Sequence, residues 1–236
     1  SRPICNRWSN TQHLWKTPTN TSKLWNKLIL LSVYYESKCP DSRAFVLQQL
    51  QPALQLLHEH IMLQLVPYGK SKSINYGDSG FKCQHGPAEC LGNMVQDCAL
   101  YQMRHLSDLD KLEYVACEMA IEAGARGSME CVKKSRLQGD QVAKCLRTRQ
   151  GVDLQLDSEY LTLLIRPKFI PTVTVDALFD QKVQDNALAD LTGTLCAMLQ
   201  LTHACAQYYN ALAMRHILAY PIDAENLPIY ITSKKI

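Results

Sequence analysis

The sequence predicts an α/β fold in which two parallel strands are joined by a helix. Residues 28–36 form a continuous apolar run of strand length, and residues 61–66 form a second one. Between them, residues 41–60 carry apolar side chains at helical spacing, with Pro52 inside the stripe, where we expect it to kink the helix. A buried strand, a helix and a second buried strand make the βαβ unit of a parallel sheet.

The segments after this unit predict a long loop, a helical insertion and a third strand. Residues 69–90 are rich in Lys, Ser, Gly and Asn, as is typical of a loop. Amphipathic stretches then extend through about 91–165, the last of them near 158–165, without the alternation of a strand. The β-branched run at 171–175 predicts a strand.

The two ends of the chain differ from this central part. Residues 1–27 are polar without a sustained period and are interpreted as a leader segment, and 28–205 as one domain that closes with a helix over 186–201. The C-terminal extension, 206–236, contains a possible helix through Leu218 and a strand-like segment at 229–231.

Charge and hydropathy exclude several classes of function. The net charge is +3, from 25 basic and 22 acidic side chains that are scattered along the chain. So small and dispersed a charge argues against nucleic acid or an anionic membrane surface as partner. The sequence contains no stretch of 18 apolar residues, so we expect no membrane span.

The cysteine content indicates an oxidising environment. The chain contains 10 cysteines among 236 residues, a density typical of secreted or endomembrane proteins with disulfides. The triplet that starts at Asn20 is a glycosylation acceptor motif and agrees with that route. The chain begins at Ser1 without an apolar leader, so we expect a processed form whose signal peptide is not present.

The most informative motif is Cys39-Pro40-Asp41-Ser42, which lies between the first strand and its helix. The first turn of a helix has unpaired N–H groups and partial positive charge, and both favour a thiolate. The negative Asp41 opposes this effect. The arrangement is that of a thioredoxin-type redox corner in which Ser42 replaces the second cysteine, and we expect an exposed, unpaired Cys39. A lone cysteine after a strand can also be a small buried hydrophobe.

A second cluster combines thiols with an imidazole. Cys83, His85, Cys90 and Cys98 offer enough ligands for a tetrahedral zinc site. Their spacing is not that of a common zinc finger, and in a cysteine-rich chain disulfides that brace a long loop are the favoured interpretation. We therefore assign no metal site.

Together these motifs resemble the gamma-interferon-inducible lysosomal thiol reductase family over about residues 28–205. The stretch Cys83-Gln84-His85-Gly86, with the cysteines that follow it, is strongly specific, whereas the corner at Cys39 alone is not. The resemblance is carried by residues 34–42, Leu65 to Gly69, Cys83 to Gly86, Cys90, Cys98, Cys117, Cys131, Cys145, the Ile170-Pro171 step, Cys196 and Cys205.

The resemblance implies a thioredoxin-like fold with a helical insertion between the βαβ half and the cis-proline strand. It also implies work in lysosomes or outside the cell, on disulfides of protein substrates, with no cofactor and an external small thiol as reductant. Cys39 then corresponds to the attacking cysteine, and Pro171 to a cis-proline that faces it. Pro40, Asp41 and Ile170 are expected to contact the substrate.

Two departures from the family pattern affect this interpretation. Ser42 cannot release a mixed disulfide, because a hydroxyl cannot form the second sulfur–sulfur bond. We expect Ser42 to support the Cys39 thiolate with a hydrogen bond. The alternative is a redox-inactive relative that kept the peptide groove and lost turnover. Ala177 stands where the family usually has glycine after the strand, which puts the geometry of that turn in doubt.

Eight cysteines match structural positions of the family and are expected to pair: Cys83, Cys90, Cys98, Cys117, Cys131, Cys145, Cys196 and Cys205. Eight cysteines allow 105 pairings. Proximity in the chain favours Cys131 with Cys145 and Cys196 with Cys205. Cys5, in the leader, is expected to stay free, pair with another chain or cap Cys39.

Overall fold

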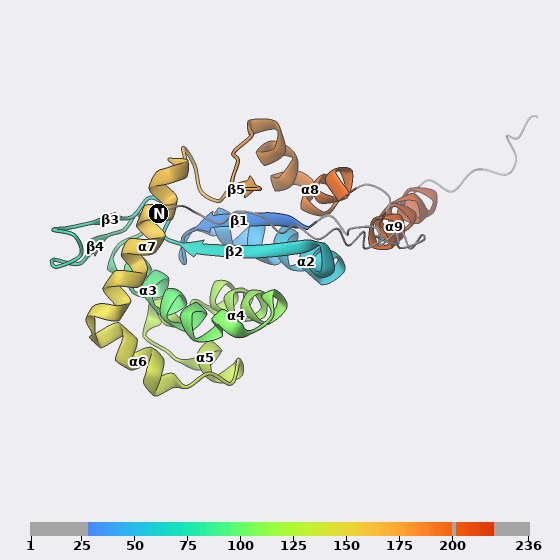
Figure 1. Ribbon diagram of the computed structural model, residues 1–236. Helices are drawn as coiled ribbons and strands as arrows, with labels where there is room; N and C mark the ends of the chain where they lie inside the picture. Colours follow the sequence, from blue (N-terminus) through green and yellow to red (C-terminus); the bar gives the residue numbers. More distant parts are fainter. Residues whose placement is uncertain (1–27, 200–201, 220–236) are drawn as a thin grey trace, which may run out of the picture.

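A computed structural model describes residues 28–199 and 202–219 (Figure 1). The strands are β1 Ile29–Tyr35, β2 Ile61–Pro67, β3 Lys72–Ser73, β4 Phe81–Lys82 and β5 Thr172–Val175. The α-helices are α1 Pro40–Phe45, α2 Gln51–Leu57, α3 Pro87–Gln102, α4 Asp108–Ile121, α5 Glu130–Lys134, α6 Gly139–Arg147, α7 Arg149–Ile165, α8 Gln181–Leu199 and α9 His203–Ala219.

A three-stranded sheet of order β2-β1-β5 forms the centre of the fold. β1 and β2 are parallel, with Ile29 opposite Ile61, and β5 is antiparallel to β1, with Val33 opposite Val173. The predicted βαβ unit is therefore confirmed. Every residue of β1 except Leu30 is buried, which agrees with its continuous apolar sequence.

The helix between β1 and β2 is interrupted where the sequence contains Pro52. A π-helical stretch, Val46–Leu50, separates α1 from α2, and Pro52 lies in the first turn of α2. The amide of Gln51 donates to the carbonyl of Val46, five residues earlier. Proline has no N–H, and its ring clashes with the preceding turn of an α-helix. The wider π-helical turn before Pro52 relieves this clash, and it lies where the sequence predicted a kink.

The helical insertion consists of α3 to α7. In the view of Figure 1, α3 to α6 lie below β2, α7 runs up the left side past the level of the sheet, and α8 lies above, next to β5. Four helices, α3 to α6, follow the predicted amphipathic stretches. The sequence placed the last helix near 158–165, but α7 begins at Arg149. Its buried stripe is small or polar (Gly151, Gln155, Ser158 and Thr162), so apolar periodicity does not reveal its first half.

Two further element boundaries differ from the prediction. The expected loop over 69–90 contains a short hairpin, β3 and β4, whose strands are only two residues long. The helix expected over 186–201 begins at Gln181, because the Asp180 carboxylate caps it by accepting from the amide of Val183 at 2.8 Å.

Four disulfides join these elements: Cys83–Cys90, Cys98–Cys145, Cys117–Cys131 and Cys196–Cys205. All eight predicted cysteines are paired, and the pairing of Cys196 with Cys205 is confirmed. The expected bond between Cys131 and Cys145 is wrong. Their helices, α5 and α6, pack against α4 and α3 respectively, and each cysteine bonds to the helix that its own helix contacts.

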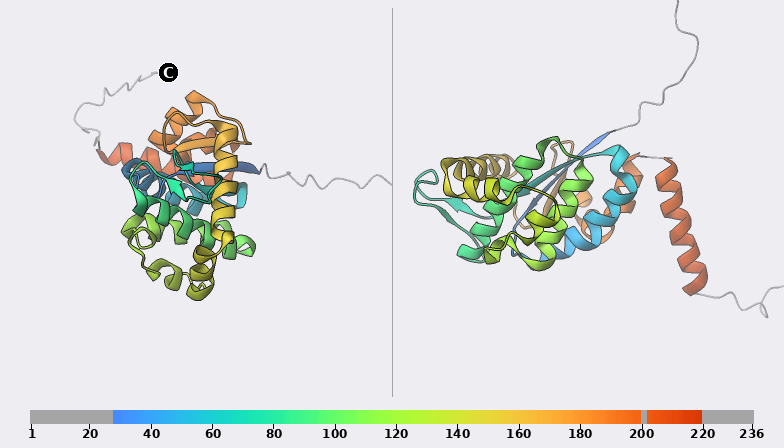
Figure 2. Two further views of the ribbon diagram at one scale, coloured as in Figure 1. Left: turned by 90° about the vertical axis from the view of Figure 1, so that its left-hand side faces the viewer. Right: turned by 90° about the horizontal axis from the view of Figure 1, so that it is seen from below.

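The helix expected through Leu218 is present as α9, which lies beside α2 and α8 at one end of the molecule (Figure 2). It begins at His203, before the predicted domain boundary at 205. The polar leader 1–27 with Cys5 and Asn20, and the strand-like 229–231, lie outside the described residues.

Candidate active site

Cys39 occupies the N-cap of α1, at the carboxyl end of β1. Its backbone is extended, with φ −72° and ψ 121°, and its sulfur accepts a hydrogen bond from the backbone N–H of Ser42 at 3.4 Å. Pro40 follows at the first helical position, which costs no hydrogen bond because that N–H has no partner within a helix. The predicted strand-to-helix corner is therefore present, and its cysteine is unpaired.

The side chain of Cys39 is less accessible than the sequence suggested. Only 7% of the residue is exposed, so the expectation of an exposed sulfur is wrong. Tyr34, Val66, Tyr68 and Ile170 form the apolar cluster around it. The sulfur also lies 3.9 Å from the carbonyl oxygen of Ile170, so the segment before β5 covers it.

The peptide bond between Ile170 and Pro171 is cis, as predicted. A buried side chain that the sequence analysis missed holds this segment in place. Gln184 of α8 donates from Nε2 to the carbonyl of Pro171 at 3.1 Å, and its Oε1 accepts from the amide of Val173 at 2.7 Å. A glutamine within an amphipathic helix gives no sequence signal for this role, because glutamine there normally faces solvent.

The hydroxyl of Ser42 does not support the sulfur in the expected way. Ser42 is fully buried, and its Oγ accepts from the backbone N–H of Glu36 at 3.4 Å. The hydrogen bond to Cys39 comes instead from the Ser42 backbone, which any residue would provide. The expected hydroxyl-to-thiolate hydrogen bond is therefore wrong. The hydroxyl closes the turn 36–42 on itself.

A groove of about 350 Å³ lies between α1, the cis-proline segment and α8, and its lining includes Asp41, two residues after Cys39, and Ile170, whose carbonyl contacts the sulfur. Asp41 is exposed at its rim, and Pro40 is exposed next to it. Ile170 and Pro171 line the opposite wall, so predicted contact residues lie on both sides. The remaining lining residues are Ala44, Phe45, Gln48, Gln49, Phe169 and Leu188.

The turn before Cys39 is braced by α3 of the insertion. The amide of Ser37 donates to Oδ1 of Asn93 at 2.9 Å, and the Ser37 hydroxyl donates to the carbonyl of Glu89 at 3.0 Å. Gly92 lies between these two residues, and a Cβ atom there would meet Oγ of Ser37 at 2.5 Å. The specific stretch at Cys83 thus leads into a helix that supports the active-site turn.

The zinc module considered from the sequence is excluded, because Cys83, Cys90 and Cys98 are all in disulfides. The fourth candidate, His85, instead contacts the carboxylates of Glu36 and Glu89. Burial raises the pKa of Glu36, and the Glu89 carboxylate raises it further, whereas the Lys70 amide and His85 lower it.

A parallel βαβ unit, a cysteine at the helix N-terminus and a cis-proline that faces it define a thioredoxin-like protein of the thiol–disulfide oxidoreductase class. Comparison with known proteins identifies its family. The profile of the family "Gamma interferon inducible lysosomal thiol reductase (GILT)" matches residues 30–148. The chain therefore belongs to the GILT family.

Two relatives agree with this assignment. The chain is similar to GILT-like protein 1 of Drosophila melanogaster, with 30% identity over 70% of this chain and 73% of the relative. It is also similar to the gamma-interferon-inducible lysosomal thiol reductase-like protein of Anopheles gambiae, with 32% identity over 71% of this chain and 75% of the relative. Among solved structures, the oxidoreductase DsbA from Xylella fastidiosa matches with a TM-score of 0.46 and 14% identity, over 74% of this chain and 87% of that one.

Among the helices of residues 28–199 and 202–219, none combines the length and the hydropathy that crossing a membrane requires.

Proposed function

We propose that this chain is a thiol–disulfide oxidoreductase that acts on protein disulfides through one redox-active cysteine, Cys39. The observation that carries the proposal is the position of this thiol. It is unpaired, caps α1 and lies next to the cis Ile170–Pro171 bond, whereas the other eight cysteines of the described residues are in disulfides.

The proposed chemistry has three exchange steps. The Cys39 thiolate attacks one sulfur of a substrate disulfide, forms a mixed disulfide and releases the other sulfur as a thiolate, which takes a proton from solvent. A small external thiolate then attacks the mixed disulfide and restores the Cys39 thiolate, leaving the small thiol bonded to the substrate. A second small thiol removes it, so the reductant supplies both electrons and no cofactor is needed.

The groove beside Cys39 supports an extended polypeptide as substrate. Its lining includes the exposed Asp41 of α1 and, from the cis-proline segment, Ile170 and Pro171. β5 is at the edge of the three-stranded sheet in the described part of the chain, so a peptide that crosses the cis-proline can reach backbone groups there. Substrates are therefore unfolded or partly unfolded proteins that contain disulfides.

The environment proposed for this activity is the lysosome or the extracellular space. Four disulfides in one domain are typical of proteins that leave the reducing cytosol. Glycosylation at Asn20 belongs to the same proposal, as does the division into a leader at 1–27, a domain at 28–205 and an extension at 206–236.

The experiment is a reduction assay with purified protein, a disulfide-containing protein and excess small thiol between pH 4.5 and 7. The wild-type chain is expected to accelerate reduction above the rate of the small thiol alone, and Cys39→Ala to abolish that acceleration. Lys82→Ala, an exposed substitution on β4, serves as a control that keeps the wild-type rate. Equal rates for the wild type and Cys39→Ala would refute the proposal.

A redox-inactive peptide-binding protein is the second candidate. The observation that favours it is Ser42, whose buried hydroxyl bonds to the turn and leaves no resolving thiol. This candidate predicts that a peptide binds the groove equally well with Cys39→Ala, while no mixed disulfide accumulates with the wild type.

A further inference from the structure

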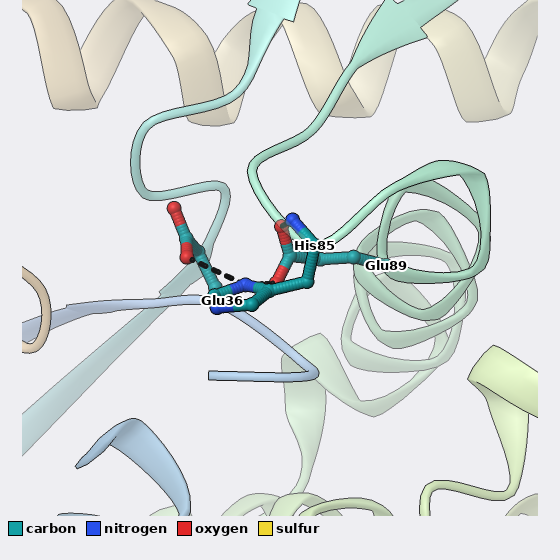
Figure 3. Close-up of side chains that lie close together, drawn as sticks. All are labelled: Glu36, His85 and Glu89. Carbon is teal, nitrogen blue, oxygen red and sulfur yellow. Dashed lines mark hydrogen bonds and ion pairs between the residues drawn. The ribbon is translucent and has the colours of Figure 1, made fainter. Parts of the chain in front are cut away.

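Three side chains that the redox chemistry does not use meet beside the active-site turn. Glu36 follows β1, His85 lies in the loop after β4, and Glu89 lies in the first turn of α3 (Figure 3). Nδ1 of His85 is 2.5 Å from Oε2 of Glu89 and 3.4 Å from Oε2 of Glu36. One donor atom from each residue lies within 4.8 Å of the other two.

The two carboxylates are held so that one oxygen of each points at the imidazole. Oε1 of Glu36 accepts from the backbone N–H of Lys70 at 2.7 Å, and Oε1 of Glu89 accepts from the backbone N–H of His85 at 3.0 Å. Backbone hydrogen bonds of this kind orient carboxylates that bind metal ions.

Oε2 of Glu36 is a buried carboxylate oxygen without a hydrogen bond. Glu36 is fully buried, and in the described part of the chain this oxygen has only an ion-pair contact, with Nδ1 of His85 at 3.4 Å (Figure 3). Buried polar atoms nearly always have a partner, and a site for a bound ion is one of the few explanations for an exception. A cation between Glu36 and Glu89 also offsets the burial of two carboxylates close together.

We propose that Glu36, His85 and Glu89 form a binding site for a divalent metal ion, and that zinc suits it best. One imidazole nitrogen and two carboxylate oxygens are ordinary zinc ligands at about 2.0–2.2 Å, which places tetrahedral donor atoms roughly 3.3–3.6 Å apart. The separation of Glu36 and His85 already has this value. The His85 side chain, 32% exposed, can turn to open its shorter contact with Glu89.

The position of the site gives the ion a structural role. The carbonyl of Glu36 accepts from the amide of Cys39 at 3.2 Å, so a ligand at Glu36 is fixed to the turn that carries the thiol. His85 and Glu89 both lie within the loop closed by the Cys83–Cys90 disulfide. The bound ion therefore ties this loop to the active-site turn, and it does so without any cysteine ligand.

The test measures zinc in the full chain with Cys39→Ser, which removes the free thiol of the described region as a ligand. The protein is loaded with zinc at pH 7.5 and dialysed, metal is quantified by mass spectrometry, and affinity is measured by calorimetry. One equivalent is expected to remain, and zinc is expected to raise the melting temperature. His85→Ala and the isosteric Glu89→Gln should each weaken binding at least tenfold.

Two matched substitutions serve as controls. His105→Ala removes an exposed imidazole far along the chain, and Glu118→Gln alters another buried glutamate that accepts a backbone N–H. Both should retain one equivalent of zinc. The proposal is overturned if the parent protein retains no zinc, or if folded Glu89→Gln, verified by circular dichroism, binds zinc as tightly as the parent.

Discussion

Ser42 occupies the position of the second cysteine in a C-x-x-C dithiol motif. Ser42→Cys is expected to convert the chain into an enzyme that releases its own mixed disulfide, because residue 42 lies one helical turn from Cys39 with its amide 3.4 Å from the sulfur. The measurement is the fraction of substrate trapped on Cys39 when the small thiol is omitted. We expect this fraction to fall severalfold.

The control for this substitution is Ser42→Ala. Both variants lose the hydrogen bond from the Glu36 amide to the Ser42 hydroxyl, which costs about 1 kcal/mol of stability. Only the cysteine adds a thiol. A trapped fraction that falls equally in both variants would mean that the change acts through the turn and not through sulfur chemistry.

The cis-proline segment depends on a single side chain of a neighbouring helix. Gln184→Ala leaves the buried amide of Val173 and the carbonyl of Pro171 without their partner. Such groups cost about 1–3 kcal/mol each when left unpaired, so we expect a loss of roughly 2–6 kcal/mol in the free energy of unfolding. Urea denaturation measures it, and the reduction rate should fall because the wall of the groove loosens.

Gln181→Ala is the matched control in the same helix, because Gln181 is exposed and bonds only to Asp185 within its own helix. Its effect on stability should stay within about 0.5 kcal/mol. If Gln184→Ala is equally mild, then the glutamine does not hold the segment.

The turn after β5 uses left-handed backbone at two residues that are not glycine. Asp176 has φ 51° and Ala177 has φ 61°. The turn therefore requires left-handed backbone at position 177, where the family usually has glycine and this chain has alanine. Left-handed geometry costs an L-residue roughly 1–2 kcal/mol, and glycine loses about 0.5–1 kcal/mol of backbone entropy. Ala177→Gly is expected to stabilise the protein by roughly 0.5–1 kcal/mol in urea denaturation.

Ala197→Gly provides the opposite case, because Ala197 is exposed within α8. There glycine should destabilise by about 1 kcal/mol. A destabilising Ala177→Gly would show that the alanine methyl group contributes more than the strain removes.

On the scale of the whole molecule, the sequence revealed the parts whose signals are local. The buried strand β1, the corner at Cys39 and the cis bond before Pro171 each depend on a few adjacent residues or on the family pattern. The pairing of Cys98 with Cys145 and the clamp by Gln184 depend on which helices pack together, which no local pattern encodes. The burial of Cys39 has the same cause, since it comes from Tyr68 and Ile170 far along the chain.

Buried carboxyl groups in the insertion should make the folded protein more stable toward acidic pH. Asp97 of α3 accepts hydrogen bonds from Gln155 and Ser158 of α7, and burial raises its pKa to about 8, although these hydrogen bonds lower it. Burial also raises the pKa of Glu118 in α4. Both carboxyl groups therefore bind a proton more tightly in the folded protein than in the unfolded chain.

The direction of this pH dependence follows from the difference between the pKa of Asp97 in the folded and in the unfolded chain. In the unfolded chain Asp97 loses its proton near pH 3.9, whereas in the folded protein it keeps the proton to about pH 8. Its contribution to stability is fully present below pH 3.9 and is lost as the pH rises through about 8. The free energy of unfolding, measured by urea titration from pH 4.5 to 8.5, should therefore fall as the pH rises.

Asp97→Asn should flatten this slope, and the exposed substitution Asp140→Asn should leave it unchanged. An unchanged slope in Asp97→Asn would assign the acid stability to other groups, whereas a flattened one would assign it to the buried Asp97 carboxyl group.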